Sequence, residues 1–354
     1  MPRGDGQPRM AASNAEEPRA MGGQAVIEGV MMRGPQHWAV SVRAADGSIA
    51  TRVEPVANWS ERYRKIPLAR GVMSLGESLS LGYRALHWSA NRQIADELAA
   101  EEVELAALAA TSASSEERAA IEAKIAKTRA QASKLTESTI GVTMIVALVL
   151  FAGLFLVLPA LIGKGLHRFI DVVPFQVGEG VVRIAMFLGY VSLISLMKEI
   201  RRVFEYHGAE HKAIAAYENG VELTPEAANQ FTTAHVRCGT NFLLTVMVIA
   251  IVCYSFVPTP NLWWVIGSRV VLIPVIAGIS FEVIRNAAKH MHRRWVRTAM
   301  KPGLLLQRLT TREPSLDQLE VALASLRACM TVEQVAEVDA RVGVRVPRIA
   351  PAFS

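Results

Sequence analysis

Long apolar stretches dominate the middle of the chain and predict helices that cross a membrane. The clearest runs from Ile140 to Ile162, 23 residues without one ionisable side chain. A bilayer core needs about 20 helical residues, so this stretch is long enough to span it. A second span is expected over about Gly180–Ile200, where Arg183 and Lys198 flank an uncharged centre and can extend their side chains to the membrane surface.

A charge-free run from 238 to 268 predicts two further spans. The run is too long for one helix and is interrupted by a Pro-Thr-Pro-Asn sequence that is typical of a turn. We divide it into spans at about 241–257 and 262–284. Arg269 falls inside the fourth span, where it either extends to the outer membrane surface or pairs with a polar group in the bundle.

Shorter patterns predict the structure of the remaining chain. Alternating apolar and polar residues at 38–42 and 49–56 flank an Asp-Gly turn and predict a β-hairpin. The glycine-rich stretch 22–35 lacks the pattern of a nucleotide-binding loop, and we expect a tight backbone turn there. Residues 66–89 have apolar positions at helical spacing with only three charges, which predicts an interfacial or partly buried helix.

Two other regions have helical patterns of their own. The Ala-rich, charged stretch 93–137 predicts an antiparallel helical hairpin with a break at 111–115, which acts as a spacer or as an arm that binds a partner. Near the C-terminus, Lys301-Pro302-Gly303 is expected to end a basic helix. Ser315 and Thr331 are expected to begin two more helices, which pack on the protein itself or on a partner.

These patterns predict a mainly α fold: a polytopic helical membrane protein with about four transmembrane helices and a small cytoplasmic α+β portion. The predicted segments are a disordered tail (1–21), the glycine-rich motif, β-hairpin and amphipathic helix (22–92), the hairpin insertion (93–137), transmembrane helices 1 and 2 (138–200), a cytoplasmic loop (201–240), transmembrane helices 3 and 4 (241–285), and a basic juxtamembrane segment with a helical tail (286–354).

Charge and cysteine content refine this picture. The 38 Lys+Arg residues exceed the 32 Asp+Glu residues by six, and the basic residues cluster after the second and fourth spans. The positive-inside rule therefore predicts that both termini and the 201–239 loop lie on the cytoplasmic side of the inner cell membrane. Three widely spaced cysteines do not form a disulfide framework. Basic residues beside a span need only the lipid bilayer as a partner, so no nucleic acid is expected.

The candidate chemistry lies in the 201–240 loop. His207, Glu210 and His211 follow the H-x-x-E-H order, which on a helix projects both imidazoles from one face. Two such imidazoles bind a metal, and the carboxylate takes a proton from metal-bound water. The competing interpretation is that the H-x-x-E-H spacing arose by chance. The histidines would then be ordinary residues at the membrane interface, and Glu210 would pair with a nearby basic residue.

His235 and Cys238 are the candidates for the third metal ligand. If both bind with the two helix histidines, the site is closed and the metal is structural. If only one binds, a position stays open for water and catalysis is expected. We favour the open site with His235, because a neutral imidazole needs no proton loss. Zinc is the expected divalent metal.

Several sequence motifs resemble a known family. They are GGQAVIEGVMMRGP, IPLARG, EYHGAEHKAIAAYE, HVRCGTNF and RTAMKPGLLLQRLTTREPSLDQLEVALASL. Together they resemble the YqhQ-like family of bacterial membrane proteins, a domain of unknown function described as a predicted metal-dependent enzyme. The resemblance covers about residues 20–330 and implies functional roles for Glu28, Arg33, His207, Glu210, His211, His235 and Cys238. It supplies no substrate, and the 93–137 arm looks like an insertion into its pattern.

Two functions remain open at this point. The first is a metal-dependent hydrolase at the cytoplasmic membrane face, with Glu210 as the general base. The second is a non-enzymatic membrane scaffold or assembly factor, in which a structural metal or a hydrogen-bonded His/Cys cluster fixes the loop and residues 93–137 or the C-terminal helices bind a protein partner.

Overall fold

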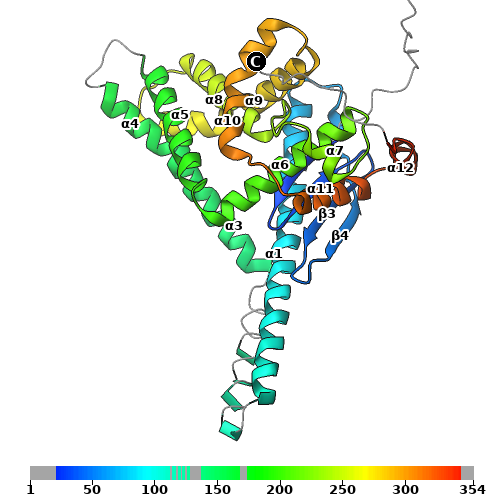
Figure 1. Cartoon of the computed structure of the whole chain (residues 1–354). Coiled ribbons are helices and arrows are strands. Elements are labelled where there is room, and N and C mark those ends of the chain that lie inside the picture. Colours follow the sequence, from blue (N-terminus) through cyan, green and yellow to red (C-terminus); the bar gives the residue numbers. More distant parts are fainter. Residues whose placement is uncertain are drawn as a thin grey trace, which may run out of the picture.

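The computed structural model describes residues 21–111, 114–116, 119–120, 122–123, 126–127, 137–167 and 174–343. In this part of the chain, a small sheet with helices on both faces adjoins a group of long apolar helices (Figure 1). The tail predicted at 1–21 lies outside the described residues except for Met21, as does most of the second arm of the predicted 93–137 hairpin.

The sheet has four antiparallel strands in the order β1-β2-β3-β4. They are β1 Gly22–Val26, β2 Gly29–Arg33, β3 His37–Arg43 and β4 Ile49–Pro55. β3 and β4 form the predicted hairpin. The glycine-rich stretch is more than a turn, because β1 and β2 form a second hairpin with Glu28 at φ 55°. The sequence of β2 does not alternate between apolar and polar residues, because helices cover both faces of the sheet.

Alternate strand residues pack on opposite faces of the sheet. The covering helices are α1 Ala69–Thr111, α6 Lys198–Glu218 and α11 Leu316–Ala328. Val30 and Met32 of β2 lie in a hydrophobic core shared with α6 and α11. Met31 lies in a second core with Leu81 and Ala85 of α1. The sheet therefore has a helical layer on each side, which holds α6 in a fixed place.

α1 is one continuous helix, whereas the sequence suggested a helix over 66–89 and a separate arm from 93 onward. No glycine or proline lies between the two segments, so nothing interrupts the helical hydrogen bonds. α1 ends at Thr111, where the break was predicted. Its second half projects away from the rest of the molecule (Figure 1).

Among the residues that the structure describes, three helical segments are long and apolar enough to cross a membrane: Ile145–Gly165, Phe175–Ile194 and Trp263–Lys289. The apolar helices are α3 Glu137–Ala152, the π-helical η2 Gly153–Val157, α4 Leu158–His167, α5 Phe175–Ile194, α8 Gly239–Ser255 and α9 Leu262–Lys289. α8 forms at the predicted third span but has only 17 residues. The second span was predicted over about Gly180–Ile200, whereas α5 begins earlier, at Phe175, and ends at Ile194.

Arg269 pairs with a polar group inside the bundle, which is the second of the two interpretations above. Its guanidinium contacts both carboxylate oxygens of Glu179, and Arg183 contacts the same carboxylate. The Arg269 guanidinium also lies 4.1 Å from the centroid of the Tyr254 ring. Arg269 and Glu179 are 0% and 1% exposed. Glu179, one residue before the predicted start of the second span, therefore lies within α5 as a buried counter-charge.

Four further elements of the described residues are η1 Trp59–Tyr63, α7 Pro225–Asn229, α10 Arg294–Thr310 and α12 Val332–Asp339. α11 and α12 begin at capping boxes on Ser315 and Thr331, as expected. The predicted helix end at Pro302 is wrong, because α10 continues to Thr310. Its packing against α8 outweighs the hydrogen bond that proline removes.

Candidate metal centre

Helix α6 supplies two of the candidate ligands. Its central part, from Tyr206 to Tyr217, is largely buried, and it packs against β1, β2, α7 and α11. The helix ends where Gly220 adopts a left-handed conformation at φ 68°. His207 and His211 are one turn apart, so both side chains leave the same face. Their ring centroids are 4.5 Å apart.

Backbone carbonyl groups fix the orientation of both imidazoles. Nδ1 of His207 lies 2.8 Å from the carbonyl oxygen of Thr310, and Nδ1 of His211 contacts that of Thr233. Because a carbonyl oxygen can only accept, each Nδ1 carries the hydrogen and each neutral ring leaves Nε2 as the ligand atom. Burial also lowers the pKa of His211, which favours its neutral form. This arrangement is typical of metal-binding histidines.

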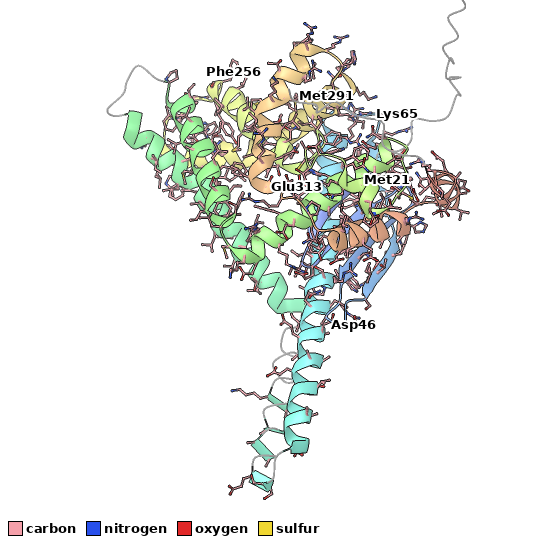
Figure 2. All side chains as sticks on the ribbon, in the orientation of Figure 1. Met21, Asp46, Lys65, Phe256, Met291 and Glu313 are labelled. Carbon is pink, nitrogen blue, oxygen red and sulfur yellow. The ribbon has the colours of Figure 1, made fainter. Side chains whose placement is uncertain are left out.

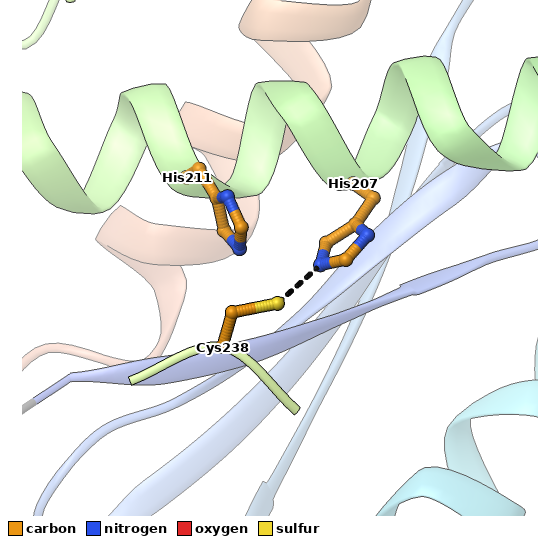
Figure 3. A group of neighbouring side chains, drawn as sticks. All are labelled: His207, His211 and Cys238. Atoms are coloured by element: carbon orange, nitrogen blue, oxygen red, sulfur yellow. Dashed lines mark hydrogen bonds between the residues drawn. The ribbon is translucent and has the colours of Figure 1, made fainter. Parts of the chain in front are cut away.

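The third candidate ligand, Cys238, precedes the first turn of α8. Its sulfur lies 3.3 Å from Nε2 of His207 and accepts a hydrogen bond from the N–H of Thr240. One ligand atom from each of His207, His211 and Cys238 lies within 4.8 Å of the others. Figure 3 shows the two rings and the sulfur facing one another. The N–H groups of a first helical turn favour negative charge on a group placed there.

The three side chains fit a zinc ion. Zinc binds imidazole nitrogen and thiolate sulfur, and a tetrahedral site separates such ligand atoms by about 3.3–3.6 Å. The sulfur of Cys238 and Nε2 of His207 are already at this spacing. Three protein ligands leave the fourth position of the tetrahedron for water or substrate, as in catalytic zinc sites.

His235 lies beside this group and not within it. Its ring centroid is 5.5 Å from that of His211, and its Nε2 is 3.6 Å from the carboxylate of Glu218. The Gln307 side chain accepts a hydrogen bond from the His235 N–H at 2.8 Å and donates one to its carbonyl at 2.7 Å. The geometry therefore favours Cys238 as the third ligand, the reverse of the preference drawn from the sequence.

Glu210 is buried between α6 and β1, with 6% of its surface exposed. The backbone of Gly23 in β1 lies against its side chain. A Cβ atom on Gly23 would lie 2.7 Å from Cγ of Glu210, so only glycine leaves room for this carboxyl. Burial raises the pKa of Glu210, and His207 and His235 act in the opposite direction. A raised pKa beside the imidazoles suits a group that exchanges protons near neutral pH.

Glu28 and Arg33, the two charges of the glycine-rich stretch, are engaged in other interactions. Both carboxylate oxygens of Glu28 contact Arg202, and the Tyr206 hydroxyl donates to the same carboxylate at 3.4 Å. Arg33 pairs with Glu77 at 3.0 Å. These ion pairs attach the β1–β2 hairpin to α6 and to α1. The geometry gives neither residue a place among the metal ligands.

Sequence reasoning missed the groups that orient the ligands. Thr233 and Thr310 act through their backbone carbonyls, a group that every residue has, so no sequence signal could identify them. Gln307 is 1% exposed on the apolar face of α10. A single amide among the apolar positions of a helix is a sequence signal that could have identified Gln307, because a buried polar group needs a hydrogen-bond partner.

The chain matches a family model and a curated protein over most of its length. Residues 66–332 match the model of a family described as protein of unknown function (DUF1385). The chain is 32% identical over 331 residues to "Uncharacterized protein YqhQ" of Bacillus subtilis (strain 168). The aligned region covers 92% of this chain and 96% of that protein. No solved structure matches. The chain therefore belongs to a YqhQ-like family of unknown function, DUF1385.

Proposed function

We propose that this protein is an integral membrane protein with a mononuclear zinc centre that hydrolyses its substrate at the cytoplasmic membrane face. The observation that carries the proposal is the convergence of ligand atoms from His207, His211 and Cys238 within 4.8 Å. The carbonyl oxygen at Nδ1 of each ring adds support. In metal-binding histidines, the ring nitrogen that does not bind the metal usually donates a hydrogen bond to such a group.

The proposed roles follow from the chemistry of the site. A zinc ion held at this site would supply Lewis-acid chemistry, which activates water as a nucleophile near neutral pH. His207, His211 and Cys238 would hold the ion, while the Thr310 and Thr233 carbonyls keep the rings in place. Glu210 would accept the proton of the attacking water, since its pKa lies above that of an exposed glutamate.

The membrane placement rests on the apolar helices and on charge asymmetry. α5, α9 and the segment 145–165 are long enough to span a bilayer, and α8 is proposed as a shorter fourth span. Basic residues follow α9 closely, and α6 begins with a basic turn. By the positive-inside rule, both termini and the metal centre are cytoplasmic.

Metal analysis of the purified protein tests the zinc centre. The wild type should contain about one zinc ion per chain, and His207→Ala and Cys238→Ala should each lose most of it, because a three-ligand site cannot spare a ligand. Cys253→Ala is the matched control, since Cys253 is a free cysteine of α8 outside the group. His235→Ala should keep its zinc. Full zinc in Cys238→Ala, or its loss in His235→Ala, would overturn the ligand assignment.

The substitution Glu210→Gln separates catalysis from structure. It removes the proton acceptor and keeps the side-chain shape, so we expect normal zinc content and protein level together with loss of function in cells. Loss of zinc or of folded protein in this variant would instead make Glu210 a structural residue.

A second candidate function is a membrane scaffold whose metal centre only stabilises the fold. The burial of two ligands favours it, because His211 is 1% and Cys238 is 5% exposed. The centre would then join α6 to the start of α8, and residues 93–137 or the C-terminal helices would bind a protein partner. In that case Glu210→Gln keeps its function in cells, whereas Cys238→Ala loses stability together with metal.

A further inference from the structure

Helix α10 carries several positive charges and no negative charge. Its 17 residues include four basic ones and no aspartate or glutamate. All four are exposed: Arg294, Arg297, Lys301 and Arg308. Spacings of three, four and seven residues place them on one side of the helix. These four residues form a basic stripe along α10, whose ends are marked in Figure 2 by Met291, just before the helix, and Glu313, just after it.

The basic stripe is not neutralised by other groups of the described chain. Within the residues that the structure describes, none of its four side chains forms an ion pair or a hydrogen bond. By contrast, Arg183, Arg202 and Arg269 each contact a carboxylate. The four charges of the stripe are therefore available to an anionic partner.

α10 lies where two of the proposed spans end. It begins shortly after the last residue of α9, Lys289. At its other end, the hydroxyl of Thr310 lies 3.2 Å from that of Thr240, in the first turn of α8. Between these points α10 packs against α8, and the two helices are neighbours in Figure 1. If α8 and α9 span a bilayer, α10 therefore runs along the membrane surface from the end of one to the start of the other.

Two large apolar side chains are exposed on the same helix. Trp295 is 67% and Leu305 is 54% exposed. Tryptophan is enriched at membrane surfaces, where its ring contacts apolar chains and its N–H stays hydrated. Basic residues combined with exposed Trp and Leu are typical of a helix that lies in a membrane surface. A soluble acidic partner would account for the charges but would leave Trp295 and Leu305 without a role.

The buried face of α10 reaches the candidate metal centre. The carbonyl of Thr310 orients His207, and the side chain of Gln307 holds the backbone of His235. Gln307 and Thr310 are both buried. The position of α10 at the membrane surface therefore also sets the position of the centre.

We propose that the basic stripe of α10 binds an anionic lipid surface, with Trp295 and Leu305 among the lipid headgroups. This contact would fix α10 across the ends of α8 and α9 and would hold the metal centre next to the membrane. The inference rests on the membrane placement proposed above, and it does not require that the centre binds zinc.

Amide hydrogen exchange of the full chain in micelles of a neutral detergent tests this surface. Added phosphatidylglycerol should slow the exchange of residues 293–310, and phosphatidylcholine should not. The double variant Arg297→Gln/Lys301→Gln should need at least about tenfold more phosphatidylglycerol, because each basic residue near an anionic lipid surface changes affinity about fivefold. The control Arg62→Gln/Lys127→Gln removes two other exposed bases and should respond as the wild type does. Trp295→Ser should also raise the required lipid concentration.

Several outcomes would overturn the proposal. An unchanged response in the stripe variant, or an equal loss in the control variant, would mean that the stripe is not the binding surface. Equal protection of residues 293–310 by soluble polyglutamate, with no effect of Trp295→Ser, would mean a soluble acidic partner. If the double variant does not fold, Arg297→Gln alone should raise the required lipid concentration about fivefold, and no change would contradict the assignment. Zinc content should match the wild type in every variant, so failure here is distinct from failure of the metal centre.

Discussion

At the scale of single residues, Gly23 is the most sensitive position near the candidate centre. A Cβ atom there would lie 2.7 Å from Cγ of Glu210, whereas one on Gly22 would meet nothing within 4 Å. We expect Gly23→Ala to destabilise the fold by about 1–3 kcal/mol through overpacking. Gly22→Ala is the control and should cost much less. Chemical unfolding of both variants measures the difference, and equal stabilities would mean that Glu210 moves aside freely.

The two histidines of the centre could be predicted from the sequence, but their third partner could not. A spacing of four residues on a helix places His207 and His211 on one face whatever surrounds the helix. His235 and Cys238 both follow at a distance that a loop can cover in many ways. Tertiary hydrogen bonds, from Gln307 to the His235 backbone and from Asn241 to the Val236 carbonyl, hold the course of that loop so that the sulfur faces the rings.

At the scale of elements, α5 and α9 depend on the buried carboxylate of Glu179. The variant Glu179→Gln leaves Arg183 and Arg269 without their counter-charge, and removal of one partner from a buried ion pair costs about 3–5 kcal/mol. We expect a loss of this size in unfolding measurements in detergent. Glu199→Gln, at an exposed position on α6, is the control and should stay near wild-type stability. A Glu179→Gln variant as stable as the wild type would show that the two arginines are stabilised by other groups.

The existence of most elements followed from periodicity, but several of their ends did not. The β3–β4 hairpin and the starts of α11 and α12 depend on local turn and capping residues, which the sequence displays. The β1–β2 hairpin was missed because a strand covered on both faces lacks alternation. α10 passes Pro302 because Gly303 lies against Asn241 of α8, where a Cβ atom would be 1.8 Å from the amide oxygen.

At the scale of the whole molecule, the proposed orientation places the metal centre in the cytoplasm. Single cysteines at Thr259, in the turn between α8 and α9, and at Asn219, at the end of α6, test it in intact cells. We expect a membrane-impermeant thiol reagent to label the first and not the second, because basic residues flank the side that holds α6. A Cys253→Ala background without added cysteines controls for native thiols. Labelling of Asn219→Cys alone would place the centre outside.

The sequence by itself determined the apolar helices, the β3–β4 hairpin and the pair of imidazoles on α6. Each of these depends on composition or on residues within a few positions of one another. The tertiary structure decided which carboxylate neutralises Arg269 and which side chain joins the histidines. Glu179 and Arg269 lie 90 residues apart in the sequence. Gln307, which holds the loop that carries Cys238, lies 72 residues from its hydrogen-bond partner His235. Such contacts depend on how whole helices pack, because local spacing carries no information about which distant side chain will fill a buried position.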